Sequence, residues 1–181
     1  MEKTQKKLIL FMPSMDGGGV EKNLIIITNF LSKYIKNLIL ITFDDGFNKK
    51  FSKKIKIINL KKKTGKKYSK YFKYFICLLI LSKEVLKNNH TSVISFQANI
   101  YTIILSMILR FDLIIRSNAS PSGWTKSFIK NYLFKIFFRY PKSIIVNSLD
   151  FKKEIDKKFG ITSTLIYNPL NKKEILIKSK E

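Results

Sequence analysis

The chain has 181 residues, of which 45% are hydrophobic, and this is enough for one packed domain but too short for two large ones. Its formal net charge at pH 7 is +23, because 35 lysines and arginines face only 12 acidic residues. A single cysteine, Cys77, excludes a disulfide within the chain, and a single histidine, His90, excludes a histidine-rich metal site.

The distribution of apolar residues argues against a membrane-spanning segment. The apolar runs at residues 75–81 and 100–109 are far shorter than the roughly 20 residues that a bilayer-spanning helix needs. The apolar run near the N-terminus is short and meets Pro13 and Asp16, unlike a signal peptide. We therefore expect a cytoplasmic protein, either soluble or bound peripherally to the inner face of the membrane. Cys77 lies in an apolar run and is expected to pack as a small hydrophobe.

The positive charge has three interpretations that the sequence leaves open. It can attract an anionic membrane surface or an acidic substrate. It can also reflect an AT-rich coding sequence, since lysine, isoleucine, asparagine and phenylalanine are abundant while arginine is scarce. Nucleic acid ranks third as a partner, because no recognition element and no known nucleic-acid motif organises the lysines.

The first elements predicted along the chain are a strand, a tight glycine turn and a helix. The strand is the continuous apolar run at residues 8–12, and the helix extends from Val20 to about Tyr34. Two further strands are predicted at residues 37–43 and 55–60. Asp44 and Asp45 follow the first of these in a turn, where we expect them to be exposed.

Twelve lysines and no acidic residue lie between residues 48 and 74, a composition typical of a solvated, mobile surface segment. The end of this segment is amphipathic, as in helices that lie on anionic membranes, although its aromatic residues could equally pack in a core. These residues are Tyr68, Tyr71, Phe72, Tyr74 and Phe75.

Strands and helices continue to alternate after this segment. Helices are predicted up to Lys87, over residues 99–109 and 124–139, and from the Ser148 cap to Phe159, where Gly160 ends the helix. Strands are predicted at residues 92–96, 113–116, 143–146 and 164–167. This alternation predicts an α/β fold with a Rossmann-like, doubly wound, mostly parallel sheet.

Ligands of such sheets bind outside the carboxyl ends of the strands. Polar segments follow three predicted strands at that edge, and they contain the candidate binding residues. A glycine turn supplies backbone N–H groups at a helix start, Arg116 supplies a guanidinium, and three amides supply donors and acceptors. Plainer interpretations are a connecting turn, a surface arginine and a loop-capping asparagine. The residues are Gly17, Gly18, Gly19, Gln97, Asn99, Arg116 and Asn118. No metal-ligand cluster and no nucleophilic constellation appears in the sequence, and no cofactor is expected.

Five short motifs together resemble a known family. They are GGVE at residues 18–21, IIRSNASPSGW at 114–124, IIVNS at 144–148, KKFGI at 157–161 and IYNPL at 166–170. In this order and at these distances they look like the N-terminal domain of family 4 glycosyltransferases of the GT-B fold. The nearest likeness is to enzymes that build capsular, O-antigen or other surface polysaccharides. The resemblance covers residues 8–170.

The resemblance implies transfer of a sugar from a nucleotide-sugar donor to a glycan or lipid-linked acceptor, with retained anomeric configuration and without a metal. By position, Gly18 and Gly19 would approach the donor diphosphate, and Glu21 would anchor the helix start. Many members carry a cleft-facing histidine or acid near the loop of Arg116 and Asn118. This chain has no histidine there, and the catalytic residues stay unassigned.

The resemblance divides the chain into an N-terminal lobe, residues 1–170, and a truncated linker, residues 171–181, after the crossover at Asn168-Pro169. No sequence corresponding to the donor lobe follows. Because transfer needs donor and acceptor held together, we expect the chain alone to be inactive. It would be a truncated copy, half of a split enzyme or an acceptor-binding module. The alternative function is a non-catalytic basic module on an anionic membrane or polymer.

Overall fold

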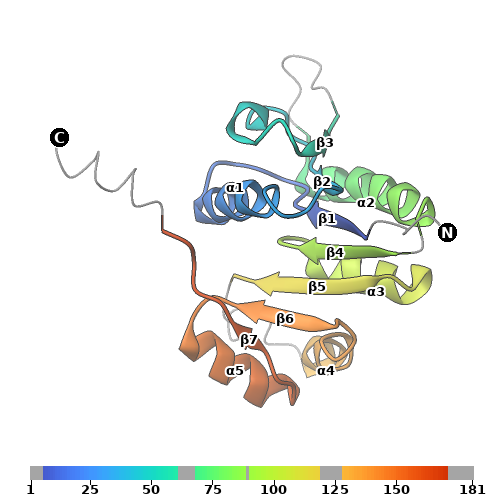
Figure 1. The fold of residues 1–181 in the computed structure, drawn as a ribbon. Coiled ribbons are helices and arrows are strands. Elements are labelled where there is room, and N and C mark those ends of the chain that lie inside the picture. Colours follow the sequence, from blue (N-terminus) through green and yellow to red (C-terminus); the bar gives the residue numbers. More distant parts are fainter. Residues whose placement is uncertain (1–5, 61–67, 89, 119–127, 171–181) are drawn as a thin grey trace.

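The computed structural model describes residues 6–60, 68–88, 90–118 and 128–170. Within these residues seven strands form one sheet in the order β3-β2-β1-β4-β5-β6-β7, and every neighbouring pair is parallel. The arrowheads of β4, β5 and β6 accordingly point the same way (Figure 1). The strands are β1 (Lys7–Phe11), β2 (Leu38–Ile41), β3 (Lys56–Ile58), β4 (Thr91–Ser95), β5 (Asp112–Ser117), β6 (Ser143–Val146) and β7 (Thr164–Leu165).

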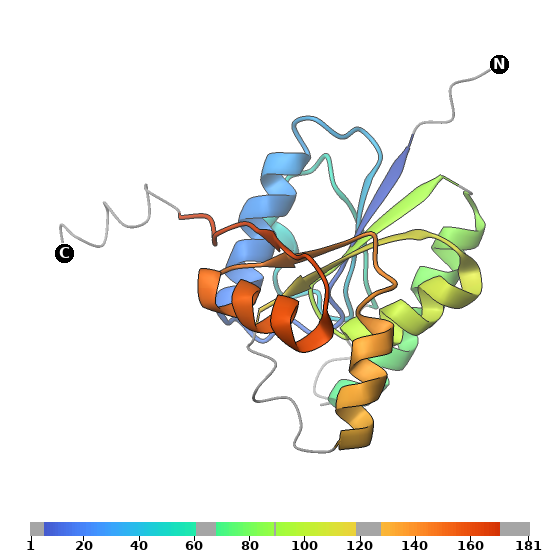
Figure 2. The same ribbon diagram turned by 90° about the horizontal axis from the view of Figure 1, so that it is seen from below.

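Helices cover both faces of the sheet, which confirms the predicted doubly wound α/β fold. The helix α1 lies on one face, and α2, α3 and α4 lie on the other (Figure 2). The helix α5 packs beside α4 against β6 and β7. The bounds are α1 (Gly19–Leu31), α2 (Lys70–Leu86), α3 (Asn99–Leu109), α4 (Phe128–Phe137) and α5 (Leu149–Phe159), with a short 3-10 helix η1 (Asn48–Lys50).

Successive residues of β1 pack into two separate hydrophobic cores, one on each face of the sheet. Ile9 and Phe11 pack in the cluster that contains Cys77 and Leu81 of α2, whereas Leu10 packs in the cluster of Leu24 in α1. Side chains of a strand alternate between the two faces, and a parallel sheet is covered on both. The continuous apolar run of β1 is therefore the pattern of a strand buried on both sides.

The predicted caps of α5 are present. The Ser148 hydroxyl accepts a hydrogen bond from the backbone N–H of Phe151, and Gly160 ends the helix at φ 63°. The start of α2 has a cap of the same kind, in which Ser69 accepts from the N–H of Phe72. The last strand is shorter than predicted, ending at Leu165.

Cys77 is fully buried, as expected from its apolar run, and burial raises the pKa of its thiol to about 12. The thiol therefore stays protonated at neutral pH and behaves as a small apolar group. Among the described residues, no helix combines the length and the apolar character needed to cross a membrane.

A buried ion pair joins the first strand to α2. Lys7 Nζ lies 2.8 Å from Glu84 Oε2 and donates a 2.7 Å hydrogen bond to the Glu84 carbonyl oxygen. Lys87 approaches the other carboxylate oxygen at 2.5 Å. Although burial opposes ionisation, these hydrogen bonds lower the pKa of the Glu84 carboxyl to about 2.

We predict that Glu84→Gln lowers the free energy of unfolding by about 3 kcal/mol, because it leaves the ammonium of Lys7 buried beside a neutral amide. The carboxyl titrates near its ordinary 4.5 when unfolded and near 2 when folded. As the pH falls between these values, the unfolded state binds the proton first, so stability is lost on acidification. Denaturant unfolding from pH 6 to pH 2 measures this loss, which the Gln variant should lack.

The matched control is Asp112→Asn, which removes the carboxylate of the exposed pair Lys142–Asp112, 3.1 Å apart. An exposed pair contributes less than about 1 kcal/mol. Equal effects of the two substitutions would show that the pair of Lys7 and Glu84 does not stabilise the fold.

Candidate functional site

The carboxyl ends of β1, β4 and β5 bring together segments that are far apart in sequence. Gln97 Oε1, after β4, accepts a 3.0 Å hydrogen bond from the N–H of Ser14, after β1. The side chain of Asn99 donates to the carbonyl of Arg116 at 3.2 Å, and that of Asn118 donates to the carbonyl of Phe96 at 3.4 Å. The strand order reverses between β1 and β4, and such a reversal is where doubly wound sheets bind ligands.

The glycine turn enters α1 with little side-chain cover. Gly17 has φ 93°, a left-handed conformation that favours glycine. Gly18 caps the helix, and a methyl group added there would lie 3.0 Å from Glu21 Oε2, whereas one added at Gly19 would meet nothing within 4 Å. The helix start, with its N–H groups and positive dipole end, is therefore open to an anion.

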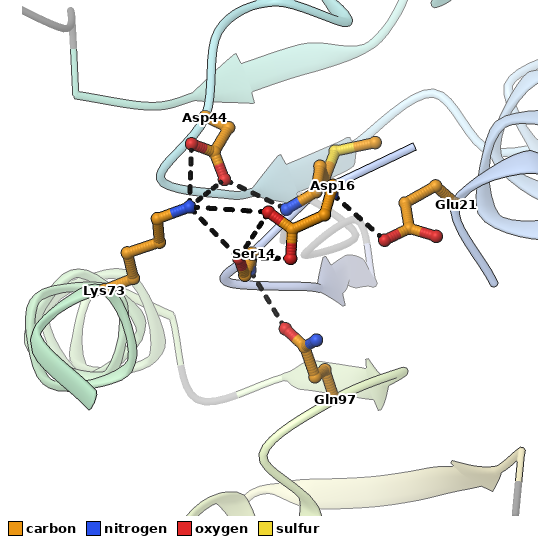
Figure 3. A network of polar contacts seen from close by, with 7 residues as sticks. Ser14, Asp16, Glu21, Asp44, Lys73 and Gln97 are labelled. Atoms are coloured by element: carbon orange, nitrogen blue, oxygen red, sulfur yellow. Dashed lines mark hydrogen bonds and ion pairs between the residues drawn. The ribbon is translucent and has the colours of Figure 1, made fainter. Parts of the chain in front are cut away.

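A buried lysine anchors the loop between β1 and α1 (Figure 3). Lys73 Nζ, from α2, lies 2.9 and 3.1 Å from the carboxylate oxygens of Asp44 and donates to the Ser14 hydroxyl at 3.1 Å. The N–H of Met15 donates to the same carboxylate of Asp44 at 2.9 Å. Asp16, mostly exposed, lies 3.8 Å from the ammonium. The network thus ties the β1 loop to β2 and α2.

Glu21 and Gln97 also hold the backbone of this loop. Glu21 is buried and accepts a 3.2 Å hydrogen bond from the N–H of Asp16, while Gln97 accepts from that of Ser14 (Figure 3). Both side chains are thus engaged with the loop backbone. In this arrangement they position the glycine turn.

Ser95 links the start of α3 to the end of β4. Its hydroxyl oxygen lies 2.8 Å from the Gln97 carbonyl oxygen and 2.9 Å from Asn99 Oδ1, and it is fully buried. Between them Ala98 adopts a left-handed conformation, φ 60°. The bonds of Asn99 to Ser95 and to the Arg116 carbonyl fix this tight connection.

Arg116 is buried rather than lying on the surface. Only 2% of the residue is exposed, its guanidinium lies 5.9 Å from the Phe96 ring centroid, and one Nη donates to Asn168 Oδ1 at 2.9 Å. Burial lowers the pKa of the guanidinium below its ordinary value, although an arginine remains charged. The contact with Asn168 links the β5 edge to the segment after β7.

Two polar atoms at this edge are buried without a hydrogen-bond partner in the described part of the chain: Arg116 Nε, a donor, and Asn118 Oδ1, an acceptor. Buried polar atoms are normally paired, so a ligand or water is the expected partner of each. Asn118 also lines a hollow of about 440 Å³. The other lining residues are Val20, Phe96, Asn99, Ile100, Ser117, Phe134 and Phe138. The hollow pairs apolar walls with a few polar groups, the usual character of a small-molecule site.

Solved structures share this fold at low sequence identity. Anabaena Alr3699/HepE in complex with UDP and glucose has a TM-score of 0.65 and 16% identity, over 91% of this chain and 45% of its own. Glycyrrhiza uralensis UGT73P12, complexed with glycyrrhetinic acid 3-O-monoglucuronide, has a TM-score of 0.58 and 10% identity, over 88% and 48%. A UGT transferase from Siraitia grosvenorii in complex with UDP has a TM-score of 0.56 and 10% identity, over 96% and 54%.

These chains are GT-B glycosyltransferases. The protein has the fold of one GT-B lobe. It spans about half the length of the structures it matches. No protein-family model matches the chain, and no curated protein matches it significantly by sequence.

Two predictions from the sequence are wrong, because two side chains expected at the surface are buried. Asp44, expected to be exposed in a turn, is only 3% exposed and pairs with Lys73. Lys73, expected in a solvated lysine segment, is itself buried within α2. Sequence reasoning therefore missed Ser14, Asp16, Asp44 and Lys73. The sequence did contain one indication for Asp44. It follows a buried strand at the carboxyl edge of the sheet, as the predicted binding residues do.

Within the described ranges of the lobe, no three His, Cys, Asp or Glu side chains gather as a metal site would require. The side chains at the carboxyl edge are instead a lysine–aspartate pair, an arginine and several amides and hydroxyls. This set can bind anions and hydroxyl groups through hydrogen bonds.

We predict that Lys73→Met lowers the free energy of unfolding by about 3 kcal/mol, because it deprives the buried carboxylate of Asp44 of its ammonium partner. It should also loosen the loop, which hydrogen exchange at the Met15 amide reports. The matched control, Lys70→Met, alters an exposed lysine one turn earlier in α2 and should cost less than about 1 kcal/mol.

The double variant Asp44→Asn with Lys73→Met should recover part of the loss, since it leaves no unpaired charge. Unchanged exchange at Met15 in Lys73→Met would contradict an anchoring role for the lysine.

Proposed function

We propose that this chain is the acceptor-side lobe of a nucleotide-sugar-dependent glycosyltransferase. One observation carries the proposal: in a GT-B lobe, an open glycine turn stands beside a hollow at the carboxyl edge of the sheet. Val20, the residue after the turn, is part of the hollow's wall. An anion at the helix start and a hydroxyl-bearing molecule in the hollow would therefore be neighbours.

The residues divide between these two tasks. Gly17, Gly18 and Gly19 would let the donor diphosphate approach the N–H groups of α1. Asn99 and Asn118 would orient the acceptor from the hollow, and Arg116 would offer its free Nε to an anionic or hydroxyl group. Solved structures of the same fold hold UDP with glucose, or UDP, which supports a uridine nucleotide as the donor's leaving group.

The chemistry would be transfer of a glycosyl group from a nucleotide sugar to an acceptor hydroxyl. Such a reaction needs donor and acceptor held together, so a second lobe would complete the site, and the chain alone would be inactive. In this proposal residues 1–170 form the lobe and 171–181, which lie outside the described residues, begin the connection to its partner lobe. From the family 4 resemblance we propose a retaining, metal-independent enzyme of surface-polysaccharide synthesis.

The acceptor would be a glycan or a lipid-linked precursor, used in the cytoplasm at the inner face of the membrane. The alternative function is a non-catalytic basic module on an anionic membrane or polymer. The two proposals predict different behaviour toward nucleotides, since only the first requires a nucleotide site at the glycine turn.

We predict that UDP-glucose, added to the isotope-labelled chain, shifts the amide NMR signals of Gly17, Gly18 and Gly19. Two or three hydrogen bonds of about 1.5 kcal/mol each provide roughly 3 to 4.5 kcal/mol, which corresponds to a dissociation constant on the order of 1 mM. Gly19→Ala should abolish the shifts while keeping the fold, because its methyl meets no protein atom within 4 Å but would take up space that a ligand on the turn needs.

The control is Gly46→Ala, whose added methyl likewise meets nothing within 4 Å but lies after β2, and it should leave binding unchanged. Shifts confined to another edge of the sheet would overturn the donor role of the turn. A micromolar dissociation constant for the isolated chain would contradict the assignment as an acceptor lobe.

A further inference from the structure

Three of the helices on the face opposite α1, namely α2, α3 and α4, expose many large apolar side chains. Tyr71 on α2 is 74% exposed, Ile108 on α3 is 68% exposed, and Ile129 on α4 is 71% exposed. Others accompany them on each helix and immediately after α4: Phe72, Phe75, Leu79, Leu86, Tyr101, Ile104, Met107, Tyr132, Leu133, Ile136 and Tyr140. We call this set, with the three residues above, the outer apolar face.

Helical spacing places these residues on one side of each helix. On α2, residues 71, 75 and 79 are four apart, and on α3, residues 101, 104 and 108 are three and four apart. The opposite side of α2 packs Cys77, Leu81 and Val85 into the core. A helix that is apolar all round is normally covered on all sides. We therefore expect a binding partner to cover the exposed apolar side of α2.

Contacts between the helices make the face continuous. The rings of Tyr74 on α2 and Tyr101 on α3 lie 6.1 Å apart at an angle of 64°. The Tyr140 hydroxyl, just after α4, donates to the carbonyl of Ser106 on α3 at 3.2 Å. Figures 1 and 2 both show the three helices side by side along the sheet.

The charges around this face are almost all positive. The sequences of α2, α3 and α4 contain one acidic residue, Glu84, which is buried against Lys7 and Lys87. Exposed cations stand among the apolar side chains or at the helix ends: Lys70, Lys83, Lys87, Arg110, Lys135 and Arg139. A surface that combines aromatic and aliphatic side chains with lysine and arginine matches an anionic bilayer interface.

The helix α5 shows that this composition is not general to the protein. Its sequence, LDFKKEIDKKF, mixes acidic and basic residues in the manner of an ordinary solvated helix. Within this helix Lys152 and Asp156 form an i,i+4 ion pair at 2.6 Å, in which the aspartate neutralises the lysine. Acidic residues are thus present on α5 but absent from the exposed side of α2, α3 and α4. A coding bias toward lysine and isoleucine would affect all four helices alike, so it does not explain this difference.

We propose that the outer apolar face docks the protein on the surface of an anionic lipid bilayer. The apolar side chains enter the boundary between headgroups and acyl chains, and the lysines and arginines pair with lipid phosphates. Tyrosine suits this boundary because its ring is apolar and its hydroxyl is polar. Charge complementarity favours lipid over a second copy of this chain, since each copy presents the same positive face.

This proposal revises which residues would contact the membrane. The lysines between residues 48 and 74 were the sequence-based candidate, but the described part of that segment includes the buried Lys73. The aromatic residues there divide by position: Tyr71, Phe72 and Phe75 are exposed, whereas Tyr74 is buried. The proposal does not rest on glycosyl transfer, because no residue of the outer apolar face is assigned to the glycine turn.

The test is co-sedimentation of the full chain with vesicles at low salt. Vesicles of phosphatidylglycerol and phosphatidylcholine in equal parts should bind the chain, and pure phosphatidylcholine should bind it much more weakly. The triple variant Phe75→Ser, Ile108→Ser and Ile136→Ser, with one change per helix, should reduce binding to the anionic vesicles roughly tenfold or more. Circular dichroism checks that the fold is kept.

The matched control changes three exposed apolar residues elsewhere: Phe30→Ser, Tyr34→Ser and Leu149→Ser, on α1, after it and on α5. It should bind as the original chain does. A second pair of variants tests charge: Lys83→Glu with Lys135→Glu should weaken binding roughly tenfold or more, whereas Lys22→Glu with Lys33→Glu should have a smaller effect.

Three outcomes would overturn the proposal. The first is no binding of the original chain to anionic vesicles, and the second is equal loss in the triple variant and its control. The third is a dimer in solution that the triple variant converts to a monomer, which would make the occupant a second copy. None of these bears on the UDP-glucose titration, so failure of docking and failure of the proposed transferase role are distinguishable.

Discussion

Parallel strands cannot be joined by tight turns, and this constraint governs the whole chain. Each connection must carry the chain back across the sheet, and it does so mostly as a helix. Such crossovers are right-handed, so the direction in which the chain moves along the sheet decides which face the connecting helix covers. The step from β1 to β2 runs toward the β3 edge and places α1 on one face. The steps from β4 to β5 and from β5 to β6 run the other way and place α3 and α4 on the opposite face. The reversal between β1 and β4 leaves the crevice in which the candidate site lies.

The second constraint is electrostatic and local to that crevice. The loop after β1 must carry a turn open enough for an anion, yet an open loop has few contacts of its own. The ion pair of Lys73 and Asp44 supplies some of those contacts. Glu21 and Gln97 supply others, since each accepts a hydrogen bond from a backbone N–H of the loop. The charges are thus used to hold the backbone, while the N–H groups at the helix start stay free to face a ligand. Arg116 differs, since its buried guanidinium keeps one donor unused.

Sequence patterns predicted the elements well where the pattern was local. The helix α3 was predicted with its observed bounds, and Ser148 and Gly160 cap α5 as expected, because caps depend on a few adjacent residues. The site was predicted less completely. Polar residues after strands pointed to the right edge of the sheet, but nothing local distinguishes Lys73 from the eleven other lysines between residues 48 and 74. Its burial depends on Asp44, which is 29 residues away in sequence.

The sequence by itself determined the alternation of strands and helices, the parallel sheet that this requires, and the glycine turn at the first helix. It did so because hydrophobic periodicity and turn chemistry act over a few residues. Only the tertiary structure decided which polar groups are buried together and which apolar residues are left outside. Both depend on distances between segments remote in sequence: Lys73 reaches Asp44 and Ser14 across the sheet edge, and Tyr71, Ile108 and Ile129 share a face only because α2, α3 and α4 lie side by side.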